Sequence, residues 1–491
     1  MAKFPETPAF TGLNSPVRME ADIFDVEVEG EIPDELDGAF YRVQPDPQFP
    51  PRLGHDIAFN GDGAVSMFRF DKGRLDFRHR WIGTDKFKLE RDAGRSLFGA
   101  YRNPLGDDPS VKGRYRGTAN TNVIAFGGTL FGLKEDSPPV AMDPFTLESR
   151  GYYDFAGAVK SPTFTAHPKI DPVTGDMVAF GYAAKGLCTR DIVYYEIGQD
   201  GAVKQELWFE LPYYCMMHDF GVTRDFAVFH VVPIVGSWER LEKGLPHFGF
   251  DTTLPVHVGV IRRGGTAADI RWFTLPNLFA SHVMNAFQDG EKIHFDTPEA
   301  KNNMFPFFPD VHGAPFDPQG AAAFLTRWTI DMASNGDEVE SRTRLSDLCG
   351  EFPRIDDRYA MAPYRHGWML AQDFQKPFEV EGGRSNAGLL MNCLGHVDHA
   401  TGQAQSWWVG PVSSLQEPCF VPRSETSAEG DGYVVAVCNR LVEKRSDLLV
   451  FDAQHIAEGP IATAKLPMRL RMGLHGNWHT TAALQHATLP N

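Results

Sequence analysis

Histidine is the residue type through which this sequence of 491 residues could do chemistry. A neutral imidazole is the commonest protein ligand for transition metals, and the chain contains 17 histidines. None of them forms a local metal-binding pattern such as HxH or HExxH. Their spacing along the chain therefore identifies no site, and a metal site would need a fold that brings distant segments together.

Cysteine content and net charge exclude several other functions. The six cysteines are far apart and form no CxxC pair, which is typical of free thiols in a reducing cytoplasm rather than of disulfides or zinc sites. The net charge of −17 is not interrupted by any Lys/Arg-rich run, so nucleic acid is not an expected partner. The sequence also lacks a run of about 18 apolar residues and a signal peptide. We therefore expect a cytoplasmic protein without a transmembrane segment.

Short strands joined by tight turns dominate the sequence from about residue 55 onward. A first hairpin is predicted where alternating residues at 65–70 and 74–77 flank a turn with Gly73. Further strands, most of them paired around glycine turns, are predicted at 122–126 with 129–133, 192–197 with 203–209, 282–287 with 292–295, 327–332 and 389–397. Because the chain has 47 glycines and 35 prolines, only short helices are expected, around 86–98 and 319–325.

This pattern predicts an all-β fold in one domain that spans residues 1–491. Hairpins repeated over most of the chain favour sheets closed around an axis, since large open sheets leave unpaired edges. No strict repeat of about 40 to 50 residues is present, so a sandwich or a large barrel stays open beside a β-propeller. In a propeller, the innermost strands of different blades converge on the axis, and histidines far apart in sequence can bind one ion.

Four histidine-containing segments resemble the ligand segments of the carotenoid cleavage oxygenase family. The resemblance covers nearly the whole chain, from Gly-Glu-Ile-Pro-Asp-Glu-Leu-Asp-Gly at 30–38 to Asp-Leu-Leu-Val-Phe-Asp at 447–452. It implies a seven-bladed β-propeller with a cap of loops and short helices over the face that carries Fe(II). Each of four blades would supply one ligand: His167 in Thr-Ala-His-Pro, His218 in Met-His-Asp-Phe, His282 in Ala-Ser-His-Val and His475 in Gly-Leu-His-Gly.

Three glutamates lie in further segments that resemble the family. The resemblance implies that they accept hydrogen bonds from the ligand imidazoles: Glu135 in Leu-Lys-Glu-Asp, Glu351 in Glu-Phe-Pro-Arg-Ile-Asp and Glu417 in Gln-Glu-Pro-Cys-Phe-Val-Pro. Four neutral imidazoles leave the two positive charges of iron uncompensated. A carboxylate behind an imidazole fixes its tautomer and raises its basicity, which gives these glutamates a physical role.

Within the family, the chain is most similar to the lignostilbene dioxygenase branch, which cleaves the interphenyl double bond of hydroxylated stilbenes. The resemblance implies that Phe59 stacks on a substrate ring and that Tyr101 and Lys134 hold its 4-hydroxyl and take part in catalysis. A phenol and a lysine have similar pKa values, near 10 and 10.4, so a buried ammonium beside the phenol favours the phenolate. The delocalised charge makes the central alkene carbons electron-rich. Val283, next to His282, is also predicted to contact substrate.

The predicted activity is that of a non-haem Fe(II) dioxygenase that converts a hydroxystilbene and O₂ into two aromatic aldehydes. The resemblance is also the basis for expecting a homodimer, and the apolar segment 304–309 is a candidate wall of the substrate tunnel. One alternative is an apocarotenoid cleavage oxygenase, which would need no substrate hydroxyl. Another is a non-catalytic propeller that binds partners and holds no iron. A calcium-dependent hydrolase is disfavoured because Ca²⁺ requires oxygen ligands.

Overall fold

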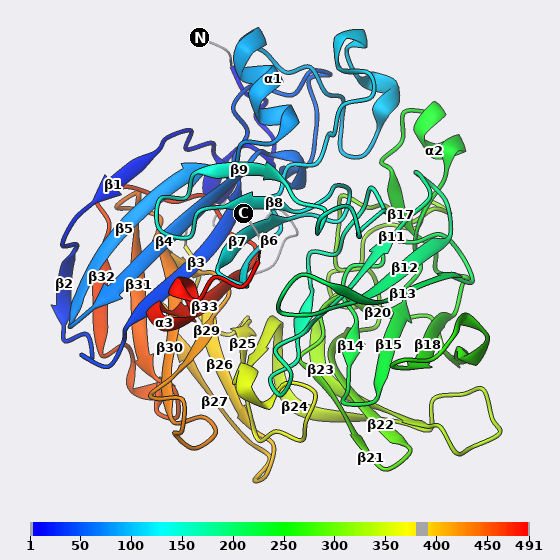
Figure 1. Cartoon of the computed structure of the whole chain (residues 1–491). Coiled ribbons are helices and arrows are strands. Elements are labelled where there is room, and N and C mark those ends of the chain that lie inside the picture. Colours follow the sequence, from blue (N-terminus) through cyan, green and yellow to red (C-terminus); the bar gives the residue numbers. More distant parts are fainter. Residues whose placement is uncertain (1–2, 380–390, 490–491) are drawn as a thin grey trace.

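The computed structural model describes residues 3–379 and 391–489 of the chain. Its strands form antiparallel sheets arranged around a central axis (Figure 1). The α-helices of the described residues are short: α1 (Asp85–Ala93), α2 (Trp238–Glu242) and α3 (Thr481–Gln485). The predicted all-β fold is confirmed, and the sheets have the radial arrangement of a β-propeller. The blade count of seven stays a prediction.

Three of the sheets have four strands each and follow one another along the chain. The first contains β6 (Asn122–Phe126), β7 (Thr129–Leu133), β8 (Val140–Met142) and β9 (Ser149–Tyr152). The second contains β10 (Lys169–Ile170), β11 (Met177–Tyr182), β12 (Asp191–Ile197) and β13 (Val203–Glu210). The third contains β14 (Gly221–Val222), β15 (Phe226–Val231), β18 (Val256–Arg262) and β19 (Arg271–Leu275).

A larger sheet of eight strands follows, in which the long strand β24 pairs with neighbours on both sides. Its members are β20 (Phe279–Ala280), β21 (Asn285–Asp289), β22 (Lys292–Ala300), β23 (Ala323–Asp331), β24 (Ser341–Ile355), β25 (His366–Ala371), β26 (Cys393–Asp398) and β27 (Gln403–Trp408). A separate pair lies in the insertion between β15 and β18, namely β16 (Ile234–Gly236) and β17 (Phe248–Phe250).

The two ends of the chain close the ring by exchanging strands between two sheets. One sheet has the order β1 (Ala21–Ile23), β5 (Arg74–Trp81), β4 (Gly63–Asp71), β3 (Gly38–Pro45) and β33 (Gly476–Thr480). The other has the order β2 (Glu27–Gly30), β32 (Ala462–Lys465), β31 (Arg445–Asp452), β30 (Gly432–Arg440) and β28 (Ser413–Leu415), with β29 (Cys419–Pro422) also paired to β30. A C-terminal strand thus completes the N-terminal sheet and an N-terminal strand extends the C-terminal sheet.

Burial along the strands explains why the sequence folds this way. All residues of β11 are buried, whereas β13, at the far edge of the same sheet, alternates between buried or half-buried and exposed positions over most of its length. Strands inside the ring are covered on both faces and read as continuous apolar runs, while outer strands show the period of two.

The strand predictions agree with the structure better than the helix predictions do. The hairpin at 122–126 and 129–133 has the predicted bounds, and the predicted helix at 86–98 is present but shorter, because Gly94 ends α1 in the left-handed conformation (φ 64°). The predicted helix at 319–325 is wrong. Residues from Ala323 onward form β23, whose pairing with β22 and β24 overrides the helix propensity of the alanines. Of the predicted strand at 389–397, residues 389–390 lie outside the described residues.

Two expectations about the whole chain can be compared with the structure. All six cysteines are free thiols, as their spacing predicts. Within residues 3–379 and 391–489, no helix has the length and apolar character needed to cross a membrane.

Candidate metal centre and adjoining pocket

The four predicted histidines come from four different sheets and meet at one point. His167, His218 and His475 lie one to three residues before the edge strands β10, β14 and β33, and His282 lies between β20 and β21. One ring nitrogen of each lies within 4.8 Å of the corresponding nitrogens of the others. Because strand edges from separate sheets converge here, the cluster marks the axis of the ring.

A buried carboxylate lies behind three of the four imidazoles. The Nδ1 atoms bond to glutamate oxygens in the following pairs: His218 to Glu135 at 2.5 Å, His282 to Glu351 at 2.5 Å and His475 to Glu417 at 2.9 Å. An ionised carboxylate only accepts hydrogen bonds, so each of these Nδ1 atoms carries the hydrogen. The Nε2 lone pairs are therefore free to bind a metal ion, and the structure brings each predicted glutamate to a predicted histidine.

The spacing of the Nε2 atoms fits a cation between them. The Nε2 atom of His218 lies 3.1 Å from that of His167 and 3.0 Å from that of His282. Lone pairs that face each other this closely repel unless a positive charge lies between them. Adjacent ligands at about 2.1 Å from a metal in octahedral geometry are about 3.0 Å apart, so the donor set fits a transition-metal ion.

His167 differs from the other three because no glutamate lies behind it among the described residues. Its Nδ1 atom lies 4.0 Å from Oδ2 of Asp219, a buried carboxylate that pairs with Lys169 at 2.7 Å and accepts from the Val283 N–H at 2.8 Å. Burial, together with the three neighbouring imidazoles, holds the pKa of His167 well below its usual value. The ring is therefore neutral and able to bind a metal. Sequence reasoning did not single out Asp219, although it is buried and directly follows His218.

A mostly apolar pocket reaches the cluster from one side. Phe59, Tyr101 and Lys134 all line it, together with His218, His282 and His475. Most of its remaining wall is aromatic or thioether: Met216, Phe279, Met304, Phe305, Phe352, Met391 and Met472. Met304 and Phe305 belong to the segment 304–309 that the sequence suggested as a tunnel wall. Such a lining suits a flat aromatic molecule with few polar groups.

Tyr101 and Lys134 are two of the polar residues that line this pocket. The Nζ atom of Lys134 lies 4.7 Å from the centre of the Tyr101 ring. Burial raises the pKa of Tyr101 well above its usual value, so its hydroxyl stays protonated and can donate a hydrogen bond. Burial lowers the pKa of Lys134, against the opposing effect of Asp136.

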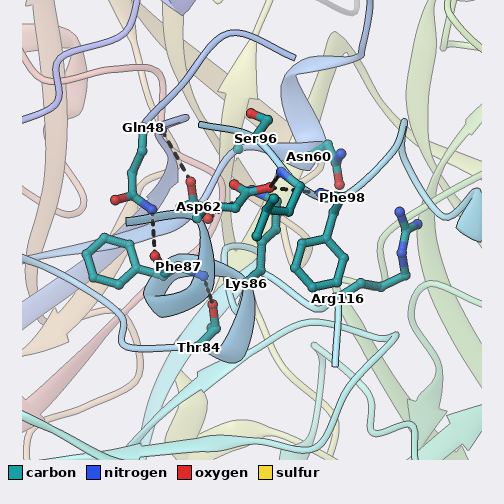
Figure 2. Close-up of polar contacts among 12 residues, drawn as sticks. Gln48, Asn60, Asp62, Thr84, Lys86, Phe87, Ser96, Phe98 and Arg116 are labelled. Carbon is teal, nitrogen blue, oxygen red and sulfur yellow. Dashed lines mark hydrogen bonds and ion pairs between the residues drawn. The ribbon is translucent and has the colours of Figure 1, made fainter. Parts of the chain in front are cut away.

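Buried polar contacts fix the segments that carry Phe59 and Tyr101. Asp56 accepts from the Tyr101 N–H at 3.0 Å, and the Asn120 side chain donates to the Phe59 carbonyl at 2.8 Å. Figure 2 shows the neighbouring network, in which Lys86 of α1 lies close to Asp62. The Lys86 Nζ atom is 3.0 Å from Asp62 and 2.9 Å from Glu90, and Glu90 accepts from the N–H groups of Leu97 and Phe98. The helix α1 therefore anchors the loop that leads to Tyr101.

A second cavity lies on the other side of the histidines and is more polar. It is bounded by His167, His282 and His475 and by the charged residues Lys169, Asp219, Arg354, Asp357, Arg358 and Glu417. Val283 borders this cavity and not the apolar pocket, although it was predicted to contact substrate.

Comparison with known proteins agrees with this geometry. The family model of the retinal pigment epithelial membrane protein (RPE65) matches residues 14–480. The chain is 58% identical to lignostilbene-alpha,beta-dioxygenase isozyme III of Sphingomonas paucimobilis, covering 99% of each chain, and 46% identical to isoeugenol monooxygenase of Pseudomonas nitroreducens, covering 96% of this chain and 98% of the relative. The crystal structure of Pseudomonas brassicacearum lignostilbene dioxygenase superposes with a TM-score of 0.94 at 45% identity, covering 98% of this chain and 100% of that one.

Proposed function

The chain belongs to the carotenoid cleavage oxygenase family, and from this premise we propose that it is an Fe(II)-dependent dioxygenase of hydroxystilbenes. The reaction would split the interphenyl double bond of a 4-hydroxystilbene with O₂ and yield two aromatic aldehydes. The observation that carries this proposal is one apolar pocket that is lined both by three of the four clustered histidines and by Lys134 and Tyr101. The printed names of two similar proteins, a lignostilbene-alpha,beta-dioxygenase and a lignostilbene dioxygenase, support the same substrate class.

Iron is the proposed metal, and His167, His218, His282 and His475 are its proposed ligands. When bound, Fe(II) would supply the coordination and activation of O₂. Three buried glutamates would keep the ligand rings in the correct tautomer and offset the charge of the ion. Although burial raises the pKa of Glu135, the hydrogen bond from His218 and the positive charges of Arg102 and Lys134 outweigh it, so the pKa lies below its usual value and the carboxylate is ionised.

Substrate would be held by its phenol end and by its rings. Phe59 would stack on one ring, and the Lys134 ammonium and Tyr101 hydroxyl would donate hydrogen bonds to the 4-oxygen. The attraction between Nζ and that oxygen would lower the pKa of the bound phenol, and the phenolate charge would spread to the central alkene carbons. The apolar walls would exclude water, which strengthens this attraction.

Oxygen uptake by iron-reconstituted protein tests the proposal. The protein is reconstituted with Fe(II) under anaerobic conditions and then supplied with oxygen and one of three substrates: a 4-hydroxystilbene, its 4-methoxy analogue or an apocarotenoid. We expect one O₂ consumed and two aldehydes formed per hydroxystilbene, with the methoxy analogue cleaved at least about 100-fold more slowly. Equal cleavage of the methoxy compound, or cleavage of the apocarotenoid alone, would contradict the proposed substrate class.

A further inference from the structure

The three residues that follow β7, at positions 134–136, are all charged, and each side chain has a different neighbour. Lys134 lines the apolar pocket, and Glu135 bonds to His218. Asp136 accepts a hydrogen bond from Lys134, with 3.3 Å between the Oδ2 atom of Asp136 and the Nζ atom of Lys134. All three are buried or nearly so, and Lys134 is only 2% exposed. The short segment therefore connects the phenol end of the pocket with the ligand set.

Asp136 accepts a hydrogen bond from the Lys134 ammonium. Within the part of the chain that the structure describes, it supplies the one hydrogen bond that Nζ makes to another side chain. The Tyr101 ring lies on another side of Nζ, at 4.7 Å from its centre. An ammonium has three N–H groups, so with one toward Asp136 and one toward the ring, a third is left for a ligand in the pocket.

Arg102 joins the two carboxylates of this segment. Its Nη2 atom lies 3.3 Å from Glu135, its Nε atom lies 3.7 Å from Asp136, and its side chain is 3% exposed. The guanidinium also packs 4.9 Å from the Tyr182 ring centre and 5.6 Å from that of Phe248, which fixes its plane. Two cations and two carboxylates balance in charge, so the buried cluster has no net charge until a phenolate enters.

We propose that Asp136 is a positioning residue for Lys134 and that Arg102 holds Asp136 in place and ties it to Glu135. Asp136 directs one ammonium N–H toward the 4-oxygen of the substrate and keeps Nζ protonated. This inference deepens the proposed function and rests on it. If Asp136 only stabilised the fold, its replacement would lower the activity by the same factor with and without Lys134 and for every substrate. A positioning role predicts instead that the loss of activity depends on Lys134.

A double-mutant cycle separates the two roles. The variants are Asp136→Asn, Lys134→Met and their combination, with Asp347→Asn as the matched control, because Asp347 makes the same kind of ion pair on the surface at 97% side-chain exposure. We expect Asp136→Asn to lower kcat/KM for a 4-hydroxystilbene about tenfold in the parent and less than about twofold in the Lys134→Met background, with iron content unchanged. The same fold loss in both backgrounds would overturn the inference.

The dependence of activity on pH gives a second test, because a purely structural role of Asp136 would not change the pH at which activity is lost. The charged and titratable groups facing Nζ are Asp136, Arg102, Glu135 and the Tyr101 phenol. Because the Asp136 carboxylate favours the ammonium, we expect Asp136→Asn to shift the loss of activity at high pH to lower pH, and Asp136→Glu to restore the parent profile. If Asp136→Asn does not fold, Asp136→Glu alone decides: a high-pH limb at the position of the parent supports the inference, and a limb that is lost, as expected for Lys134→Met, overturns it. A parent enzyme that cleaves no hydroxystilbene would instead reject the proposed function.

Discussion

At the scale of single residues, the account depends on which nitrogen of each imidazole carries the hydrogen. The Nδ1 atoms of His218, His282 and His475 face carboxylates, and this leaves the Nε2 lone pairs converging on one point. A histidine that only stabilised the core would not need a carboxylate on one side and three other imidazoles on the other. The same arrangement predicts the effects of replacing ligands and their partners.

Replacing a ligand should remove the metal and the activity together. His475→Ala leaves Glu417 without its partner and the ion with three imidazoles, so iron retained after gel filtration should fall at least about tenfold, with loss of turnover. Glu417→Gln keeps the shape of the side chain but not its charge, so this variant should lose less iron and less turnover than His475→Ala. Metal analysis of the purified variants checks this, and full iron content in His475→Ala would remove that residue from the ligand set.

Lys134 should act on the substrate and not on the metal. We expect Lys134→Met to keep iron content and to lower kcat/KM for 4-hydroxystilbenes about 100-fold, since the charge that favours the phenolate is lost. The methoxy analogue, which has no ionisable phenol, should be affected less than about threefold. A Met variant that cleaves hydroxystilbenes as fast as the parent would reject the phenolate mechanism.

The activity should also fall at high pH as Lys134 loses its proton. Burial lowers the pKa of Lys134, so the ammonium is present below that pKa and is lost as pH rises through it. The high-pH limb should therefore lie below the usual lysine value of about 10.4, and it should be absent from Lys134→Met. Steady-state kinetics across the alkaline range, with substrate ionisation measured separately, tests this; a limb that persists unchanged in the variant would contradict it.

At the scale of elements, the helix α1 matters because it supports the loop of Tyr101. The Lys86 ammonium is paired with Asp62 and Glu90 inside the protein, and Glu90 in turn binds the N–H groups of Leu97 and Phe98. These contacts connect the helix to the pocket wall through the backbone. An ion pair of the same spacing, between Glu239 of α2 and Lys243 directly after it, is exposed and has no such connection to the pocket wall among the described residues.

The two helices allow a matched comparison. Lys86→Met leaves two buried carboxylates without their cation, so the free energy of unfolding should fall by about 3 to 5 kcal/mol, and KM should rise as the Tyr101 loop loosens. Lys243→Met should change the free energy of unfolding by less than about 0.5 kcal/mol. Chemical denaturation of both variants measures this, and equal stabilities would show that the buried network does not support the loop.

The elements also show what sequence reasoning could and could not predict. Strand positions were predictable because alternation and glycine turns are local signals. The helix expected at 319–325 was wrong because strand pairing, which is not local, decides the structure of Ala323 onward. Asp136 and Arg102 were not singled out, since an acidic and a basic residue on their own are indistinguishable from surface charges until the fold buries them together.

At the scale of the whole molecule, the metal site lies where four sheets meet. The chain ends are exchanged between two sheets, and His475 directly precedes β33, the strand that completes the N-terminal sheet. The positions of the four histidines were predicted from resemblance to a family, because 193 residues separate the last two, His282 and His475, and local spacing carries no signal over that distance. The homodimer and the seven blades stay predictions.

Metal binding should therefore stabilise the ring as a whole. An ion that binds residues from four sheets favours the folded state over the unfolded one, so iron should raise Tm with increasing free metal. Thermal unfolding of the metal-free and the reconstituted protein measures this effect. A Tm that does not change with iron in the parent, or that rises equally in His475→Ala, would contradict a site shared by four sheets.

Anomalous diffraction at the iron absorption edge, from crystals of the reconstituted protein, tests the central claim most directly. The account predicts one strong peak per chain, surrounded by the Nε2 atoms of His167, His218, His282 and His475 and facing the pocket that contains Lys134. No peak at that position, or a peak held by other residues, would contradict it.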